Sequence, residues 1–318
     1  MSLSASSTSE DVCQYLADQI KGSKVLMTGV SPGSIGAHAA LHLSRHRPAL
    51  LVLAGRTLSA LQATEHAIKS ETPDANTRLL ILDLSSQESV RKAAAEVSEY
   101  PEGIDRIINS AGVMAAPYGL TREGVEMQFG INHIGHFLLT NLILPELMRK
   151  SGRVRVVNVS SLGHKRGPVR FEDPGFHNGK CYDKWQAYGQ SKTANILFSV
   201  SLAEKLGGKG VESFSLYPGR IVTGIGRHLK PEEWVKTGWK HEDGSIVDDP
   251  KLNWRTPTQA AATLIVAAYD RTISDKNGSY MVNNQVNNDE AAGYALDPDN
   301  AERLWKLSEE IVGQKFEY

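Results

Sequence analysis

The sequence contains few cysteines, almost no net charge and no long apolar run. Its 318 residues include only Cys13 and Cys181, too few for a disulfide framework or a cysteine-based zinc site. A formal net charge of -1 at pH 7 creates no basic field for a nucleic acid. No apolar stretch approaches the ~20 residues that span a bilayer, and residues 1–10 are polar rather than signal-like. We therefore expect a cytoplasmic protein with no membrane span, no nucleic-acid partner and two unpaired thiols.

Apolar segments of strand length alternate with segments of helical pattern along the chain. With 41% hydrophobic and 22% charged residues, a chain of this length can bury a large core. The alternation runs from Lys24 to about Tyr280 without a linker, which favours one α/β unit over the two domains that length alone suggests. We expect a helical extension over residues 1–22, beginning its helix near Asp11, and a single domain over residues 23–318.

The expected strands are short and nearly continuous in apolar residues, as is typical of a parallel sheet covered by helices on both faces. A helix from about Ile35 separates the first two strands and completes a strand–helix–strand unit. We therefore predict an α/β fold with a doubly wound Rossmann-type sheet of about seven strands, whose ligands bind beyond the carboxyl ends of the strands. The strands are expected at Lys24–Thr28, Leu50–Ala54, Leu79–Leu82, Ile104–Ile108, Val154–Val159, Val211–Leu216 and Gly278–Val282.

The first strand runs into a glycine-rich turn that opens a helix, Thr28-Gly-Val-Ser-Pro-Gly-Ser-Ile-Gly36. Such a turn lets the backbone approach a pyrophosphate, whose charge the following helix N-terminus stabilises. A tight loop without a ligand is the alternative interpretation. We predict a dinucleotide site with contacts from Gly29, Ser31, Gly33, Ser34, Ile35 and Gly36.

The ends of the next strands indicate which dinucleotide is bound. Where an NAD-preferring protein has an acidic residue for the ribose 2′-hydroxyl, this chain has Arg56. A guanidinium can pair with a 2′-phosphate, so we predict NADP(H), unless Arg56 is simply a solvated arginine. Asp83, followed by Leu84, is placed to bond the adenine edge or to cap a helix. Small residues after the fourth strand would let the chain pass close to the cofactor, at Asn109, Ala111 and Gly112.

Tyr188 and Lys192 are four residues apart and share one face of a helix. A tyrosine that acts as an acid or base near pH 7 needs its phenolate favoured by about 3 pKa units. A fixed neighbouring cation supplies much of that stabilisation. The pair predicts proton transfer, although a tyrosine and a lysine at this spacing also occur on solvated helix faces.

Six motifs in this order resemble the short-chain dehydrogenases/reductases, and within them the chain is similar to the branch of retinol dehydrogenases and WW-domain oxidoreductases. The resemblance extends from about Lys24 to Gly313. The glycine-rich turn is one residue longer than is usual in the family. The motifs are Thr28-Gly29 with its glycines, Asn109-Ser-Ala-Gly112, Asn132-His-Ile-Gly-His-Phe-Leu-Leu139, Val157-Asn-Val-Ser-Ser161, Tyr188-Gly-Gln-Ser-Lys192, and Pro218-Gly219 with Thr223.

The resemblance implies a catalytic group of four residues. Ser161 is chosen over Ser160 because the serine nearer the tyrosine is the catalytic one in the family. Tyr188 would protonate a carbonyl oxygen as hydride arrives from the nicotinamide, while Ser161 bonds the same oxygen. Lys192 would lower the pKa of Tyr188 and hold the nicotinamide ribose, and Asn132 would steady a water that links Lys192 to solvent.

The resemblance also implies a loop over the nicotinamide and a substrate lid over about residues 220–256. Three tryptophans in this lid favour a bulky lipophilic or secondary-metabolite substrate, unless they only anchor it to the body. The helices that hold Asn132 and Tyr188 would pair in a homodimer, and His133 and His136 are expected to be structural. The nicotinamide loop would contribute Pro218, Gly219, Val222 and Thr223.

The expected function is that of an NADP(H)-dependent ketoreductase or alcohol dehydrogenase, with no metal. The first alternative is non-redox isomerisation, cyclisation or dehydration on the same scaffold, with NADP(H) structural or bypassed. The second is a catalytically idle NADP(H)-binding protein. The presence of Ser161, Tyr188 and Lys192 together argues against the second alternative.

Overall fold

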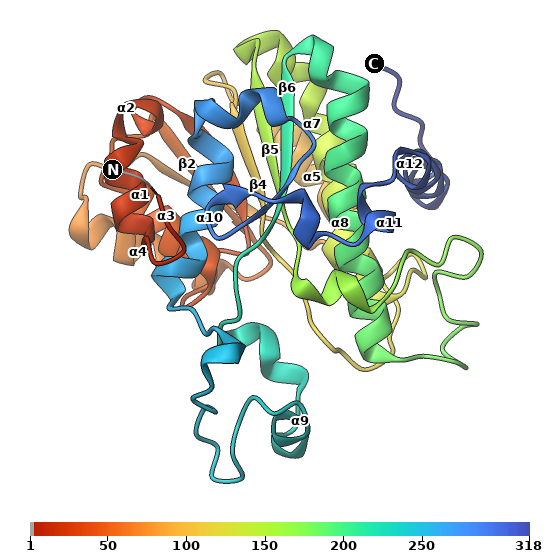
Figure 1. The fold of residues 1–318 in the computed structure, drawn as a ribbon. Helices are drawn as coiled ribbons and strands as arrows, with labels where there is room; N and C mark the ends of the chain where they lie inside the picture. Colours follow the sequence, from red (N-terminus) through yellow and green to blue (C-terminus); the bar gives the residue numbers. More distant parts are fainter. Residues whose placement is uncertain (1–2) are drawn as a thin grey trace.

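A mostly parallel sheet organises the computed structural model, which describes residues 3–318 (Figure 1). Within these residues the sheet has eight strands in the order β3-β2-β1-β4-β5-β6-β7-β8, and only β7 and β8 pair antiparallel. The predicted doubly wound fold is confirmed, with the two-residue β8 added to the seven expected strands. The strands are β1 (Lys24–Thr28), β2 (Leu50–Gly55), β3 (Thr77–Ile81), β4 (Arg106–Asn109), β5 (Val154–Val159), β6 (Val211–Tyr217), β7 (Tyr280–Val282) and β8 (Gln285–Val286).

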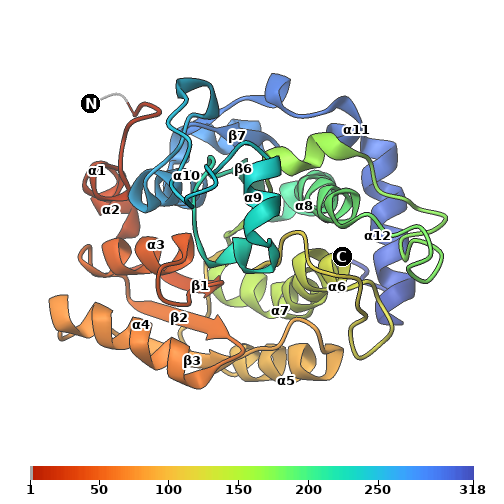
Figure 2. The ribbon, with the colours of Figure 1, turned by 90° about the horizontal axis from the view of Figure 1, so that it is seen from below.

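Helices cover both faces of the sheet. In the view from below, α10 lies on one side of β6 and α8 on the other (Figure 2). One core cluster joins α1, α3, α4 and α10 to the sheet, and another joins α5, α7, α8 and α12 to it. The helices are α1 (Ser9–Tyr15), α2 (Ala17–Ile20), α3 (Ile35–Ser44), α4 (Leu58–Glu71), α5 (Gln87–Ser98), α6 (Met127–Phe129), α7 (Gly135–Ser151), α8 (Lys184–Leu206), α9 (Pro231–Lys236), α10 (Pro257–Tyr269), α11 (Gly293–Leu296) and α12 (Pro298–Val312).

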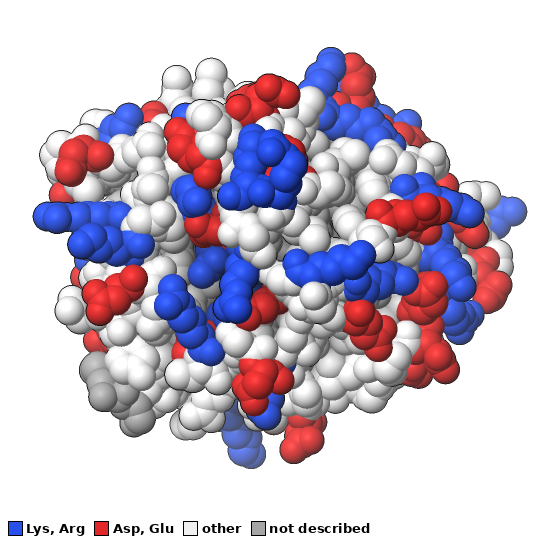
Figure 3. All heavy atoms as spheres, turned by 90° about the horizontal axis from the view of Figure 1, so that it is seen from above, with Lys and Arg blue, Asp and Glu red and all other residues white. Residues whose placement is uncertain are grey.

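The register of the sheet brings the loops after neighbouring strands to one edge. Thr28 at the end of β1 pairs with Ala54 near the end of β2, and Asn109 at the end of β4 pairs with Asn158 of β5. The segment over residues 220–256, which carries α9 and is called the lid here after its expected role, projects beyond this edge (Figures 1 and 2). On the opposite face Lys and Arg side chains are interspersed with Asp and Glu (Figure 3), so neither sign of charge dominates it.

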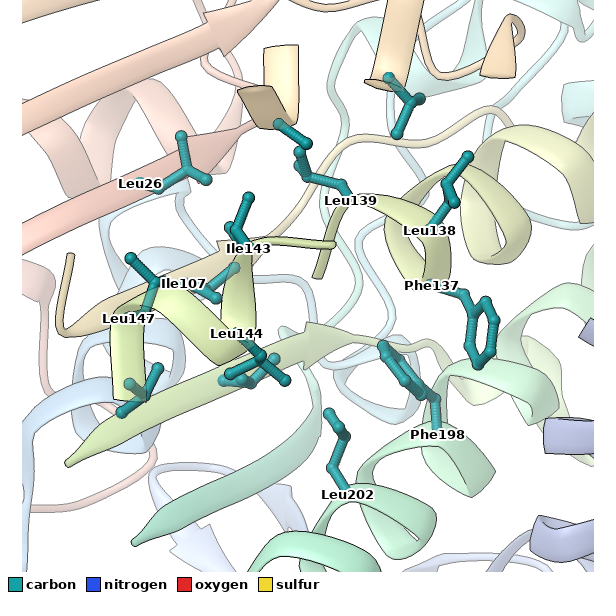
Figure 4. Packing of buried hydrophobic residues seen from close by; sticks show 14 of the residues in the cluster. Leu26, Ile107, Phe137, Leu138, Leu139, Ile143, Leu144, Leu147, Phe198 and Leu202 are labelled. Carbon is teal, nitrogen blue, oxygen red and sulfur yellow. The ribbon is translucent and has the colours of Figure 1, made fainter. Parts of the chain in front are cut away.

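Large apolar side chains hold α7 and α8 against the sheet (Figure 4). Phe137 of α7 and Phe198 of α8 are buried, with ring centroids 5.4 Å apart, and Leu26 and Ile107 from the strands belong to the same cluster. Each such side chain contributes about 1.5–3 kcal/mol on burial. This packing gives α8, which carries Tyr188, a fixed position above β5 and β6.

Local signals account for most element boundaries, and tertiary contacts for the exceptions. Thr256 caps α10 through a capping box before Pro257, as expected from the sequence. The single helix expected from near Asp11 begins at Ser9 instead and divides into α1 and α2 near Leu16. The strand expected from Ile104 begins only at Arg106, because the chain is still leaving the turn at Gly103, whose φ is 65°.

Helix α12 covers part of α7 and α8. The Trp305 ring lies 5.1 Å from that of Phe137, and Lys205 of α8 pairs with Glu302. The homodimer expected through α8 and the turn that holds Asn132 stays a prediction, and α12 occupies part of the surface it would use. No helix among residues 3–318 combines the length and the apolarity needed to cross a bilayer.

Candidate active site

A cavity of about 730 Å³ opens at the carboxyl ends of the strands, where the doubly wound fold predicts a ligand. The body of the protein forms one wall and the lid forms the other. Residues from loops after six strands line it, and they include Gly29, Arg56, Asp83, Ala111, Ser161 and Pro218.

The glycine-rich turn is shaped by contacts within the protein. A Cβ at Gly29 would lie 2.6 Å from the Ala111 nitrogen, and one at Gly36 would lie 2.6 Å from the Gly29 carbonyl oxygen. Ser34 caps α3, because its Oγ accepts from the Ala37 N–H at 3.1 Å and donates to the Gly29 carbonyl at 2.7 Å. Of the predicted contacts, Gly29, Ser31, Ser34 and Ile35 line the cavity, whereas Gly33 and Gly36 do not.

Two charged residues border the end of the cavity after β2 and β3, which we call the adenosine end. Arg56 is exposed and forms no ion pair or hydrogen bond with any residue from 3 to 318. Asp83 Oδ1 accepts from the N–H and the hydroxyl of Ser85, at 3.0 and 2.6 Å. Ser86, rather than Asp83, caps α5. Asp83 and Leu84 therefore remain at the cavity wall.

The segment after β4 divides into a buried residue and two cavity residues. The Asn109 amide donates to Asn158 Oδ1 at 2.9 Å and to Thr140 Oγ1 at 3.1 Å, and Asn109 does not line the cavity. Ala111 and Gly112 do line it. Asn109 therefore ties β4 to neighbouring segments through its Nδ2, while its buried Oδ1 has no partner among residues 3–318. Its cofactor contact stays a prediction.

Asn132 lies in a π-helical turn, Gly130–Ile134, and its amide is bound on both sides. Oδ1 accepts from the Val113 N–H at 2.8 Å, and Nδ2 donates to the Val113 carbonyl and to Ser191 Oγ, both at 2.9 Å. The side chain thereby ties the loop after β4 to α8 and does not line the cavity. The role in holding a water stays a prediction.

A buried histidine connects Asn132 to the glycine-rich turn. Thr28 Oγ1 accepts from the N–H groups of Ser110 and Ala111, both at 3.0 Å. Its own hydrogen is therefore donated to His136 Nε2 at 2.8 Å. Nδ1 of His136 must then carry a hydrogen, which it donates to the Asn132 carbonyl at 3.1 Å. Burial lowers the pKa of His136 to about 4, so this link is neutral at pH 7.

Ser161, Tyr188 and Lys192 meet on one wall of the cavity. Lys192 Nζ donates to the Val159 carbonyl at 3.0 Å and lies 5.7 Å from the centre of the Tyr188 ring. Ser161 Oγ accepts from the Gly163 N–H at 3.0 Å. The neighbouring Ser160 hydroxyl is committed to the Lys192 carbonyl at 2.8 Å, which favours Ser161 as the reactive serine.

Burial shifts the pKa values of Tyr188 and Lys192 in opposite directions. It raises the pKa of Tyr188 to about 12, although a hydrogen bond with the Ser161 side chain acts in the opposite direction. Burial also lowers the pKa of Lys192 to about 8. Both shifts favour the neutral form, as expected where solvation is lost. Burial thus favours the neutral phenol of Tyr188, and the expected lowering of its pKa by Lys192 stays a prediction.

Sequence analysis missed two residues that touch the catalytic wall. A Cβ at Gly163 would lie 2.8 Å from two carbons of the Tyr188 ring, so only glycine leaves room for the ring. Trp185 lines the cavity three residues before Tyr188, a helical spacing that could have identified it.

The lid tryptophans also line the cavity, and they pack on each other. The rings of Trp234 and Trp239 lie 5.8 Å apart, and Trp239 lies 5.9 Å from Trp185. Of the predicted nicotinamide loop, Pro218, Gly219 and Thr223 line the cavity, whereas Val222 does not. Cys181 lies outside it, in an exposed loop.

Comparisons with known proteins agree with this geometry. A family model described as short chain dehydrogenase matches residues 23–172. Retinol dehydrogenase 13 of Homo sapiens is 37% identical over 92% of this chain and 86% of its own length. Retinol dehydrogenase 11 of Homo sapiens is 34% identical over 93% and 87%.

Solved structures give the same fold. An uncharacterized protein from Mycobacterium paratuberculosis matches with a TM-score of 0.69 and 30% identity, covering 94% of this chain and 96% of that one. Pseudomonas aeruginosa RhlG, described as an NADP active-site complex, matches with a TM-score of 0.61 over 83% and 96% at 22% identity, which supports the fold alone. With relatives this similar over nearly its whole length, the chain belongs to the short-chain dehydrogenase family of oxidoreductases.

Proposed function

We propose that this protein is an NADP(H)-dependent oxidoreductase that transfers hydride between the nicotinamide and a carbonyl or secondary alcohol of a bulky lipophilic substrate. One observation carries the proposal. Ser161, Tyr188 and Lys192 share a wall of a cavity that the glycine-rich turn and Arg56 border elsewhere.

The cavity wall fits a dinucleotide with a 2′-phosphate. The N-terminus of the ten-residue α3 lies at the turn, where a pyrophosphate would be stabilised. Ser110 lines the cavity, and its buried Oγ has no hydrogen-bond partner among residues 3–318. Arg56 is exposed and unpaired within the same part of the chain, so it can form a bidentate contact with the phosphate.

The nicotinamide would supply the hydride, and this chain's residues would supply the proton and hold the oxygen. Tyr188 is neutral at pH 7, because burial keeps its pKa near 12, and it can donate to a carbonyl oxygen. Ser161 Oγ accepts from Gly163 and its hydroxyl hydrogen-bonds the Tyr188 phenol, so it would redirect its hydrogen to the same oxygen when a carbonyl is bound. Lys192 is anchored by Val159 and keeps further N–H donors for a ribose and for stabilising the phenolate.

The aromatic lining favours a large apolar substrate. Trp185, Trp234 and Trp239 line the cavity, and aromatic linings of this kind bind large apolar groups. The retinol dehydrogenases among the relatives are named for a lipophilic alcohol, which supports the same class.

Replacement of Tyr188 by Phe tests the mechanism. The variant keeps the ring that Gly163 accommodates but loses the proton, so kcat with NADPH and bulky ketones should fall by about 10²- to 10⁴-fold. NADPH affinity, measured by fluorescence titration, should stay within about twofold of the wild type if the phenol acts chiefly in the chemical step.

The same assay separates redox from non-redox chemistry. NADPH absorbance should fall in step with product formation. Product that forms while NADPH stays constant would support isomerisation, cyclisation or dehydration instead. Full activity of Tyr188→Phe would contradict the proposed mechanism.

A further inference from the structure

Outside the adenosine end and the catalytic Lys192, the charged residues that line the cavity are all cationic. They are Lys165, Arg166, Arg220 and Arg227. Among residues 3–318 the cavity wall carries one carboxylate, that of Asp83 at the adenosine end. The mixed charges of the opposite face of the molecule (Figure 3) make the contrast clear.

Three of these cations are exposed or have partners. Lys165 pairs with Glu290 at 3.0 Å. Arg166 lies over the Trp185 ring, 4.8 Å from its centre, and is exposed. Arg227 is exposed, and its Nη1 donates to a backbone carbonyl at 3.1 Å. Solvent or protein groups therefore stabilise these charges.

Arg220 differs from them. Its guanidinium carbon lies 5.3 Å from the centre of the Trp239 ring and 5.8 Å from that of Trp254. These contacts position the cation but use none of its N–H groups in ordinary hydrogen bonds. Its Nη1 is buried and has no hydrogen-bond partner among residues 3–318, and no carboxylate of those residues pairs with it. A buried donor without an acceptor is costly and rare in native proteins.

The position of Arg220 indicates which ligand would satisfy it. It follows Pro218 and Gly219, at the start of the loop after β6, and its ring contacts are with Trp239 and Trp254 of the lid. The glycine-rich turn and Arg56, which suit the phosphates of a dinucleotide, follow β1 and β2. β1 and β6 are separated in the sheet by β4 and β5. An anion that meets Arg220 therefore belongs to the substrate rather than to the cofactor phosphates.

We propose that Arg220 binds a carboxylate of the substrate, and that the physiological substrate is an anionic carbonyl compound or alcohol with an aromatic or polycyclic body. This rests on the proposed function and narrows its substrate class. The tryptophan rings contact the apolar body, and the planar guanidinium forms a bidentate, charge-assisted contact with the carboxylate. The class differs from a neutral retinoid in carrying a charge.

A matched pair of substrates tests the proposal. The probes are 4-(2-naphthyl)-4-oxobutanoate and its methyl ester, which share the ketone and the ring system and differ in charge. With NADPH, the wild type should show kcat/KM at least about tenfold higher for the acid, as expected for a charge-assisted hydrogen bond. Arg220→Gln should remove this preference by lowering kcat/KM for the acid alone, and Arg220→Lys should keep part of it.

Two controls complete the experiment. Arg153→Gln changes an exposed arginine outside the cavity and should keep the wild-type preference. The NADPH affinity of Arg220→Gln should match the wild type, which also shows that the variant is folded. The proposal is overturned if the wild type reduces acid and ester equally, if Arg220→Gln affects both alike, or if its main effect is on NADPH affinity.

Binding separates this proposal from the proposed function. The acid and the ester are titrated into the protein by following tryptophan fluorescence, without turnover. Tighter binding of the acid that Arg220→Gln abolishes supports the anion site even if neither compound is reduced. Equal binding of the acid and the ester, together with reduction of neutral ketones, would support the oxidoreductase activity and overturn the anion site.

Discussion

The two ends of the cavity handle charge in opposite ways. At the catalytic end, Tyr188 and Lys192 are buried. Burial raises the pKa of Tyr188 and lowers that of Lys192, so it favours the neutral form of each side chain. At the adenosine end, Arg56 is exposed and has no ion-pair partner among residues 3–318. The protonation of the buried end thus depends on packing, whereas the charge at the exposed end is solvated and open to a ligand.

The largest effect should come from removing the buried amine, through Lys192→Met. The pKa of Lys192 is about 8 in the folded protein, against an ordinary value of 10.5 for a lysine. A depressed folded pKa means that stability is complete above the unfolded value and is lost as pH falls toward the folded one. The unfolding free energy of the wild type should therefore rise relative to that of the variant by about 3 kcal/mol between pH 8 and 10.5.

Denaturant unfolding of both proteins across this pH range measures the difference. Using the difference removes contributions from other groups that titrate in the same window. Lys205→Met is the matched control, because Lys205 lies on the same helix but is partly exposed and paired with Glu302. If the difference in unfolding free energy between wild type and Lys192→Met stays constant with pH, Lys192 is hydrated in the folded protein and its pKa is not lowered.

Gly163→Ala should have the next largest effect. The added methyl group would lie 2.8 Å from the Tyr188 ring carbons, so the ring must move. A displacement of this kind lowers kcat by about 100-fold, while NADPH affinity should be little changed. Gly175→Ala adds a methyl group with no atom of residues 3–318 within 4 Å beyond its chain neighbours and should be neutral. Unchanged kcat in Gly163→Ala would mean that the position of Tyr188 is not set by this contact.

Arg56→Asp probes the exposed end and should have the smallest effect. The carboxylate would repel a 2′-phosphate and accept a hydrogen bond from a 2′-hydroxyl. The ratio of NADPH to NADH affinity, measured by fluorescence titration, should therefore fall by at least about tenfold. Arg153→Asp makes the same change at an exposed position outside the cavity. If both variants keep the wild-type ratio, the prediction of NADP(H) is wrong.

Much of the fold was predictable, because the strands are apolar runs bounded by polar residues. The bounds of β1 and β5 agree with the sequence to the residue. The start of β4 does not, since Ile104 is apolar and buried but precedes the ladder. An apolar pattern reports burial, and burial extends beyond hydrogen-bonded pairing.

The candidate site was predictable as a set of residue types and less so as a set of contacts. Ser161, Tyr188 and Lys192 lie together at the cavity as the motifs predict. Asn132 and Asn109 belong to motifs of the same set, but their side-chain Nδ2 groups donate hydrogen bonds to neighbouring segments of the protein. Nothing in the local sequence distinguishes an amide that faces a ligand from one that ties two loops together.

The sequence by itself determined the order of strands and helices, the glycine-rich turn and the residues that can transfer a proton, because these depend on periodicity and on local chemistry. Only the tertiary structure decided that Tyr188 is neutral, that His136 joins Asn132 to Thr28, and that Arg220 has a buried donor without a partner. Burial and hydrogen bonding arise between segments far apart in the chain, so they exist only once the sheet has brought those segments together.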